Sequence, residues 1–281
     1  MNNLSIVFII VTLSVSFILP LAFLVGYAQR HKKQGIWSAW LLGALGFFVP
    51  QILIRLPILT GLSQLSGFAA FAQTHPVAYG FGLAFTAGLF EVVGRYAVAR
   101  CLKKNLTYRR ALAAGLGHGG IEAILITGLA YLSNVVFLVM LQTGGFEAAI
   151  SQTTAAGRDV TPLLTAKDAL MNTPWTMFLL AGYERLLTMV CQTAMSVMVC
   201  YGMASGKPGK YILLCLGLHT LLDCTAGISL YIGKGLTLAT GYCIIYTILT
   251  AAAILSMVIL RTILRRWAEV SKQEVAYDPQ A

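Results

Sequence analysis

Long apolar runs alternate with short polar stretches along almost the whole chain. The first run, from Leu4 to Ala28, contains no charged residue, and similar runs recur until about residue 262. An α-helix of about 20 apolar residues crosses the roughly 30 Å hydrocarbon core of a bilayer, so the pattern predicts transmembrane helices. We expect seven spans, at roughly 4–29, 37–60, 79–101, 110–141, 174–203, 210–231 and 235–262.

The composition agrees with this pattern. Hydrophobic residues make up 58% of the 281 residues and charged residues only 11%, compared with about 25% in soluble domains. The predicted fold class is all-α, a polytopic membrane protein with a single transmembrane domain over residues 1–281. The six cysteines lie inside or beside apolar runs without CxxC spacing, so we expect them to pack in the core.

Basic residues cluster in alternate connections. RHKK at 30–33, RCLKKNLTYRR at 100–110, SGKPGK at 205–210 and RTILRRW at 261–267 are basic, whereas the 61–78 connection has no Lys or Arg. Because excess Lys and Arg marks the cytoplasmic side, we expect an external N-terminus and a cytoplasmic C-terminus. The net charge of +10 is explained by this orientation, and no nucleic-acid partner is predicted.

Two segments modify this arrangement. Residues 142–173 form a long external loop in which LLTAKDAL is weakly amphipathic, so a cap over the outer surface and a plain loop both stay open. Pro50 and Pro57 flank Arg55 in the second span and predict a kink there.

Ionisable side chains inside the spans need a reason, because each costs roughly 2.5 to 3.5 kcal/mol to insert. Five places carry them: Arg55; Glu91 with Arg95; His118 with Glu122; Glu184 with Arg185; and His219 with Asp223.

Three of these residues share a predicted depth. Glu91, His118 and His219 are eight or nine residues from a basic residue at the cytoplasmic end of their own span. At 1.5 Å per residue, all three lie about 12 to 14 Å from the same membrane face. Their partners Arg95, Glu122 and Asp223 each follow four residues later, which places each pair on one helix face. Such faces, turned inward, would build a polar chamber in the cytoplasmic third of the bilayer, although mutual neutralisation of Glu91 and Arg95 is the simpler alternative for that pair alone.

Glu184 and Arg185 are adjacent and are expected to point in different directions. Glu184 is more than 20 residues from Lys207, so it lies nearer the outer face, where a structural role is favoured. Arg55 is the expected partner of Glu184.

A glutamate and two histidines at one depth suit hydrolysis of a peptide bond by an activated water. Burial disfavours the ionised form of Glu91, which suits a general base, while Arg95 opposes that effect and keeps a carboxylate available. His118 would orient the attacking water, His219 would donate to the developing oxyanion, and Asp223 would fix the tautomer of His219.

The same residues also allow a metal site. His118, Glu122, His219 and Asp223 form two i,i+4 ligand pairs suited to Zn²⁺, with Glu91 as the base for a coordinated water. The spacing is not HExxH, so the presence of a metal is left open.

Three motifs resemble those of the CAAX-protease and bacteriocin-processing membrane peptidases. FEVVGR at 90–95, GHGGIE at 117–122 and HTLLD at 219–223 are similar to that family's EExxxR, FxxxH and HxxxN, and the closest resemblance is to its YhfC branch of intramembrane metalloproteases. Phe90, Ala114 and Asp223 replace the family's first glutamate, aromatic residue and asparagine.

The resemblance implies a role for each motif residue. Glu91 would be the catalytic base and Arg95 its positioning partner. His118 would activate water, and His219 with Asp223 would form the oxyanion pair.

We therefore expect a multi-pass protein of the bacterial cytoplasmic membrane that cleaves a peptide near the cytoplasmic side. Its expected partners are the lipid bilayer and a membrane-embedded or lipidated peptide substrate. The alternatives are a proton- or ion-coupled transporter that uses the buried Glu, Arg and His groups, and bis-histidine haem binding by His118 and His219. An inverted repeat, as many transporters have, is not evident in the sequence.

Overall fold

A computed structural model describes residues 2–32 and 34–277, so Lys33 of the first basic cluster lies outside the described residues. Among these described residues, seven helical segments are long and apolar enough to cross a membrane: Asn3–Arg30, Ile36–Ser63, Pro76–Asn105, Tyr108–Thr143, Trp175–Ala204, Pro208–Tyr231 and Leu238–Glu269. No strand occurs within the described ranges. The all-α, polytopic fold class is confirmed, while the sides of the membrane on which the termini lie remain a prediction.

The described chain forms two compact units, residues 2–22 with 123–186 and residues 23–122 with 187–277. The single domain expected from the sequence remains a prediction.

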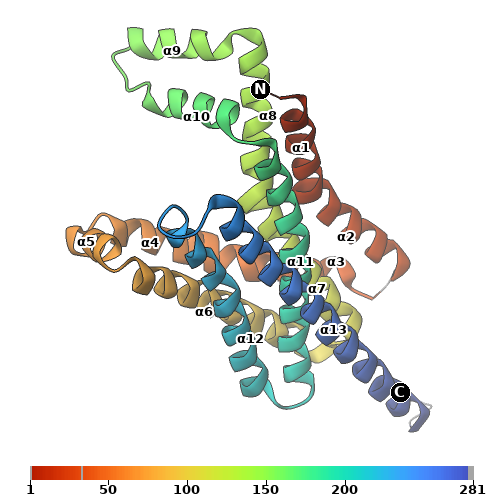
Figure 1. The fold of residues 1–281 in the computed structure, drawn as a ribbon. Coiled ribbons are helices and arrows are strands. Elements are labelled where there is room, and N and C mark those ends of the chain that lie inside the picture. Colours follow the sequence, from red (N-terminus) through yellow and green to blue (C-terminus); the bar gives the residue numbers. More distant parts are fainter. Residues whose placement is uncertain (1, 33, 278–281) are drawn as a thin grey trace. The chain divides into compact units, whose positions relative to one another are not determined.

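The first unit packs the beginning of the chain against the second half of the fourth span, and a helical hairpin follows that span (Figure 1). Its core contains Ile9, Tyr131, Leu138, Leu170 and Phe178. Its elements are α1 (Asn3–Leu13), the π-helical turns η1 (Ser14–Ile18) and η4 (Ala123–Gly128), α8 (Leu129–Thr143), α9 (Gly145–Ala155), α10 (Thr161–Asn172) and the first part of α11 (Trp175–Ala204).

The long connection at 142–173 is mostly helical. After α8 the chain turns at Gly144, whose φ of 72° favours glycine, and α9 and α10 then lie side by side (Figure 1). Lys167 of α10 donates to Glu147 of α9 over 2.6 Å, and this hydrogen bond lowers the pKa of the Glu147 carboxyl below its ordinary value. LLTAKDAL belongs to α10 and buries Leu170, which agrees with its amphipathic pattern.

The second unit carries every residue of the predicted chamber. Its spans begin where the sequence supplies helix starts, with Pro76 and Pro208 in the first turns of α6 and α12. Its elements are the remainder of α2 (Leu19–Arg30), α3 (Ile36–Phe47), η2 (Phe48–Arg55), α4 (Leu56–Ser63), α5 (Ser66–Thr74), α6 (Pro76–Leu102), η3 (Lys103–Asn105), α7 (Tyr108–Glu122), the remainder of α11, α12 (Pro208–Cys224), η5 (Thr225–Tyr231) and α13 (Leu238–Tyr277).

Helices α3, α6 and α7 approach one another at glycines. A Cβ atom added to Gly43 of α3 would lie 1.9 Å from the carbonyl oxygen of Ala114 of α7. One added to Gly94 of α6 would lie 1.9 Å from the carbonyl oxygen of Gly46 of α3. Small residues allow this backbone contact between transmembrane helices. The contacts fix the helices that carry Glu91 and His118.

The second span changes its helical geometry around its prolines. Residues Phe48–Arg55 form π-helical turns, and Pro57 lies in the first turn of α4. Proline removes an N–H donor from the helical ladder, and π-helical turns are often found at functional sites. The kink itself remains a prediction.

The prediction of core cysteines holds for half of them. Cys191, Cys200 and Cys215 are buried, but Cys101 and Cys243 are exposed, so for these two it is wrong.

Candidate active site

The carboxylate of Glu91 is the centre of a buried polar cluster. Glu91 lies in α6 with only 4% of its surface exposed. Its Oε1 accepts a hydrogen bond of 2.8 Å from Nε2 of Gln51, and its Oε2 accepts bonds of 2.9 Å from Arg95 and 3.2 Å from Gln192. Arg95 follows one turn later, as the i,i+4 spacing requires.

Both histidines of the predicted chamber contact the same carboxylate oxygen. Nε2 of His118, from α7, lies 3.1 Å from Oε2 of Glu91, and Nε2 of His219, from α12, lies 2.8 Å from it. Both side chains are buried, and the ring of Phe47 packs edge-on against His118. Both Nε2 atoms are directed to Glu91, so the arrangement gives the haem alternative no support.

Two of the three nitrogens of Arg95 donate to side chains of α11. Its Nε donates to Oγ of Ser196 over 3.3 Å, and its Nη2 donates to Oε1 of Gln192 as well as to Glu91. The amide oxygen of Gln192 faces Arg95, so its amide nitrogen faces Glu91. The same nitrogen also donates to Glu122 over 2.5 Å. A buried charge requires such partners.

Asp223 and Glu122 lie at the edges of the cluster, Glu122 next to Gln192 and Asp223 next to His219. Oδ2 of Asp223 is 3.4 Å from Nδ1 of His219, close enough for ionic attraction, but the geometry does not make a hydrogen bond. Its side chain is 39% exposed. Asp223 therefore supports His219 from the open side and does not touch Glu91.

The orientation of Gln51 is fixed by Arg55. Nη1 of Arg55 donates to Oε1 of Gln51 over 3.2 Å, so the amide nitrogen of Gln51 faces Glu91. Arg55 is itself held by the carbonyl of Leu83 at 2.7 Å and the hydroxyl of Thr86 at 3.3 Å. Arg55 is thus linked to the central carboxylate of Glu91 through the side chain of Gln51.

Glu184 and Arg185 belong to the first unit. Nη2 of Arg185 lies 2.5 Å from Oε1 of Glu184, so the expectation that these neighbours point apart is wrong. The arginine side chain is long enough to reach back along the helix. The expected pairing of Arg55 with Glu184 would join the two units and remains a prediction.

Sequence reasoning missed three neutral members of the cluster, which are Gln51, Gln192 and Ser196. An amide inside a predicted span was the available signal for two of them, because a buried amide in a membrane needs partners as a charge does.

Some hydrogen-bonding capacity around the cluster is unused. Nη1 of Arg95, Nδ1 of His219 and Oγ1 of Thr220 are buried and have no hydrogen-bond partner in the described part of the chain. Buried polar groups are normally satisfied, so these atoms fit a site that holds water or substrate.

The residues present also fit a metal ion. Glu91, His118 and Glu122 each offer one ligand atom, and these atoms lie within 4.8 Å of one another. Imidazole nitrogen and carboxylate oxygen are ligands that Zn²⁺ prefers. Two carboxylates beside the single guanidinium of Arg95 leave the group with negative charge to attract a cation.

Comparison with known proteins identifies the family. The model of the family described as YhfC intramembrane metalloprotease matches residues 15–249. This chain belongs to the YhfC family. It is 31% identical over 223 residues to the uncharacterized membrane protein YhfC of Bacillus subtilis (strain 168), which covers 79% of this chain and 84% of that protein. No solved structure matches the chain.

The match bears out the resemblance to the YhfC family, and the seven apolar helices identify a multi-pass membrane protein. The matched residues, 15–249 of this chain, include Glu91 and the five residues whose side chains contact its carboxylate: Gln51, Arg95, His118, Gln192 and His219.

Proposed function

We propose that this YhfC-family chain is an intramembrane endopeptidase in which Glu91 activates the water that attacks a peptide bond. The observation that carries the proposal is the convergence of Arg95 and both histidines on Oε2 of Glu91, in a buried site. These contacts keep the carboxylate ionised and in place, so that it can accept a proton as soon as substrate binds.

The proton steps are assigned to Glu91. As the oxygen of water attacks the scissile carbonyl carbon, Glu91 takes one of the water's protons. When the carbon–nitrogen bond breaks, Glu91 gives that proton to the leaving amine. Arg95 and Gln51 hold the carboxylate in place through these steps.

The oxyanion is assigned to His219. Its Nε2 would turn from Glu91 to the carbonyl oxygen on which negative charge develops, and Asp223, 3.4 Å from Nδ1, would stabilise a ring that carries protons on both nitrogens. The unused Nη1 of Arg95 is a second donor for that oxygen.

His118 and Glu122 would hold a divalent ion beside Glu91, which remains the base, and the ion when bound would supply Lewis-acid activation of water and of the scissile carbonyl. His118 additionally orients the carboxylate through the 3.1 Å contact.

The decisive experiment replaces Glu91 by glutamine, which keeps the shape and removes the base. Purified parent, Glu91→Gln and a matched Glu147→Gln control, whose carboxylate is exposed on α9, are mixed with tagged single-span membrane proteins. We expect cleavage to fall by about 10²- to 10⁴-fold in Glu91→Gln only. Cleavage at the parent rate would remove the proposal. Proton uptake into vesicles that depends on Glu91, without any cleavage, would favour the transport alternative.

A further inference from the structure

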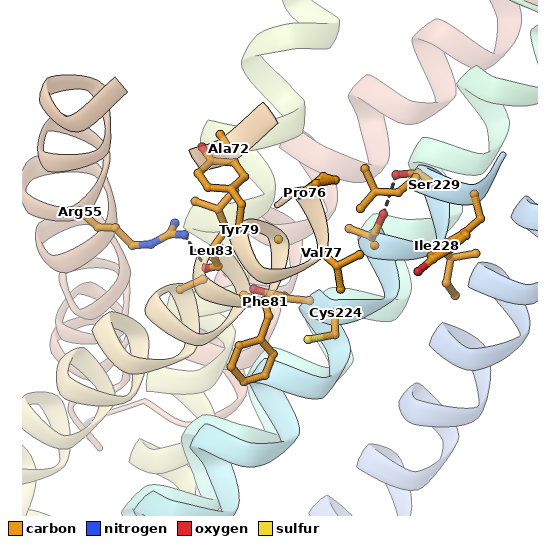
Figure 2. Close-up of a pocket in the computed structure, with 18 residues that line it drawn as sticks. Arg55, Ala72, Pro76, Val77, Tyr79, Phe81, Leu83, Cys224, Ile228 and Ser229 are labelled. Atoms are coloured by element: carbon orange, nitrogen blue, oxygen red, sulfur yellow. Dashed lines mark hydrogen bonds between the residues drawn. The ribbon is translucent and has the colours of Figure 1, made fainter. Parts of the chain in front are cut away.

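A cavity of about 810 Å³ lies in the second unit, between the first half of α6 and the end of α12 with η5 (Figure 2). Its size is within the range of roughly 300 to 1,000 Å³ typical of ligand sites. Its lining is mostly apolar, with Val77, Phe81, Ile228 and Leu230 among the contributors, and carries Arg55 and Asp223.

The cavity ends at the Glu91 cluster. Ala87 lines it four residues before Glu91, and the carbonyl of Ala87 accepts a hydrogen bond from Gln51. Asp223 lines it beside His219, and Arg55 lines it while donating to Gln51. The lining residues Ala87, Arg55 and Asp223 therefore each contact a side chain, Gln51 or His219, that itself contacts Glu91.

The cavity extends away from the basic loops. Some of its lining residues belong to the connection between the second and third spans, which contains α5, and others belong to η5 at the end of the sixth span. With one crossing per span, these two places share one side of the membrane, and the basic loops 100–110 and 205–210 share the other. By the predicted orientation the cavity faces the outer side.

The two charged residues in the lining indicate what the cavity holds. Arg55 has five N–H groups, of which three are used in the described chain, and it reaches from η2 toward Leu83 (Figure 2). Asp223 presents a partly exposed carboxylate. A hydrocarbon chain would offer nothing to the remaining N–H groups of Arg55 or to the exposed part of the Asp223 carboxylate, whereas a peptide offers carbonyl oxygens to Arg55 and N–H groups to Asp223.

We propose that this cavity is the substrate-binding channel and holds an apolar peptide segment, which enters from the side of α5 and η5, opposite the basic loops. Arg55 and Asp223 bind the backbone of the segment, and the apolar walls bind its side chains. The inference rests on the proposed endopeptidase function.

The direction of entry is tested with Cys224, which lines the cavity. The background is Cys101→Ser with Cys243→Ser, which removes the two exposed thiols. A membrane-impermeant sulfonated maleimide is applied to each side of sealed vesicles, and Ser205→Cys in the exposed basic loop marks the opposite side. We expect Cys224 to react only from the side that leaves Ser205→Cys unlabelled. Labelling from the same side as Ser205→Cys, or from neither side, would overturn the proposed entry.

The occupant is tested by protection of Cys224 in the Glu91→Gln protein. A ten-residue Leu/Ala peptide with blocked termini should slow labelling by fivefold or more, and palmitate should not. Equal protection by palmitate would identify a lipid site and overturn the peptide assignment, as would no protection by the peptide.

Two glycines of α6 provide a matched pair for this measurement. Gly80 lines the cavity and Gly82 does not, and a Cβ at either has nothing within 4 Å. We expect Gly80→Trp to abolish peptide protection and Gly82→Trp to preserve it. Protection of Cys224 does not require hydrolysis. Failure of the proposed peptide channel, seen as no protection, can therefore be distinguished from failure of the proposed endopeptidase function, seen as no cleavage.

Discussion

Gln51 donates a hydrogen bond of 2.8 Å to Oε1 of Glu91 from a different transmembrane span. Gln51→Met would remove this donor and the acceptor of Arg55 while keeping a similar volume. Leaving buried polar groups unsatisfied costs about 1–3 kcal/mol, so we expect the free energy of unfolding to fall by that amount and cleavage to decrease. Unfolding in detergent measures the first effect. Gln64→Met, at an exposed position directly after the same span, is the control and should change neither quantity. A Gln51→Met protein as stable as the parent would contradict this prediction.

The pair of Glu91 and Arg95 should be strongly coupled. Arg95→Met leaves a buried carboxylate without its guanidinium, and breaking one side of a buried pair costs about 3–5 kcal/mol. Glu91→Gln combined with Arg95→Met should recover part of that loss, because the uncompensated charge is gone. A double-mutant cycle of unfolding free energies measures the coupling. Arg100→Met, exposed on the same helix, serves as the control, and additive effects of the Glu91 and Arg95 changes would exclude the coupling.

The glycine contacts predict that a single methyl group disturbs the site. In Gly94→Ala the added carbon would lie 1.9 Å from a backbone oxygen of α3, which cannot move as a flexible side chain can. Overpacking costs about 1–3 kcal/mol or more, so we expect a lower unfolding temperature and weaker cleavage. Gly82→Ala adds the same methyl group to the same helix in open space and should be tolerated. Equal stability of the two variants would show that α3 and α6 are not in contact at Gly94.

Metal content distinguishes a metal-dependent form of the proposed reaction from a form in which Glu91 activates water without a metal. If His118 and Glu122 hold a zinc ion beside Glu91, the purified parent contains it in stoichiometric amount, and His118→Ala and Glu122→Gln each lose it. Elemental analysis of the same samples used for cleavage provides the measurement. His75→Ala, with an exposed ring at the start of α6, controls for loss of a surface histidine. Active parent protein that contains no metal would refute the zinc form.

The sequence predicted the parts of this site that stand out against an apolar background. A charge inside a hydrophobic run is conspicuous, and counting residues to the nearest basic loop placed Glu91, His118 and His219 at one depth. The structure brings their side chains within hydrogen-bonding distance of one oxygen.

The rest depended on contacts between distant segments. Gln51 and Gln192 are neutral, and no spacing rule links them to Glu91, 40 and 101 residues away. The pairing of Arg55 with Glu184 remains a prediction, but the contacts of Arg55 with Gln51, Leu83 and Thr86 could not be predicted from depth alone. The cavity beside Asp223 is formed by packing of helices, which hydropathy does not describe.

The placement of Glu91 and Arg95 on one helix also bears on how the protein is made. During synthesis the third span leaves the ribosome before His118, Gln192 and His219 exist, so none of these can stabilise Glu91 as that span enters the bilayer. The guanidinium four residues later can, because the bond between Nη2 and Oε2 needs no other helix. The segment can therefore partition into lipid as a nearly neutral unit, with the histidines joining the carboxylate only after later spans arrive.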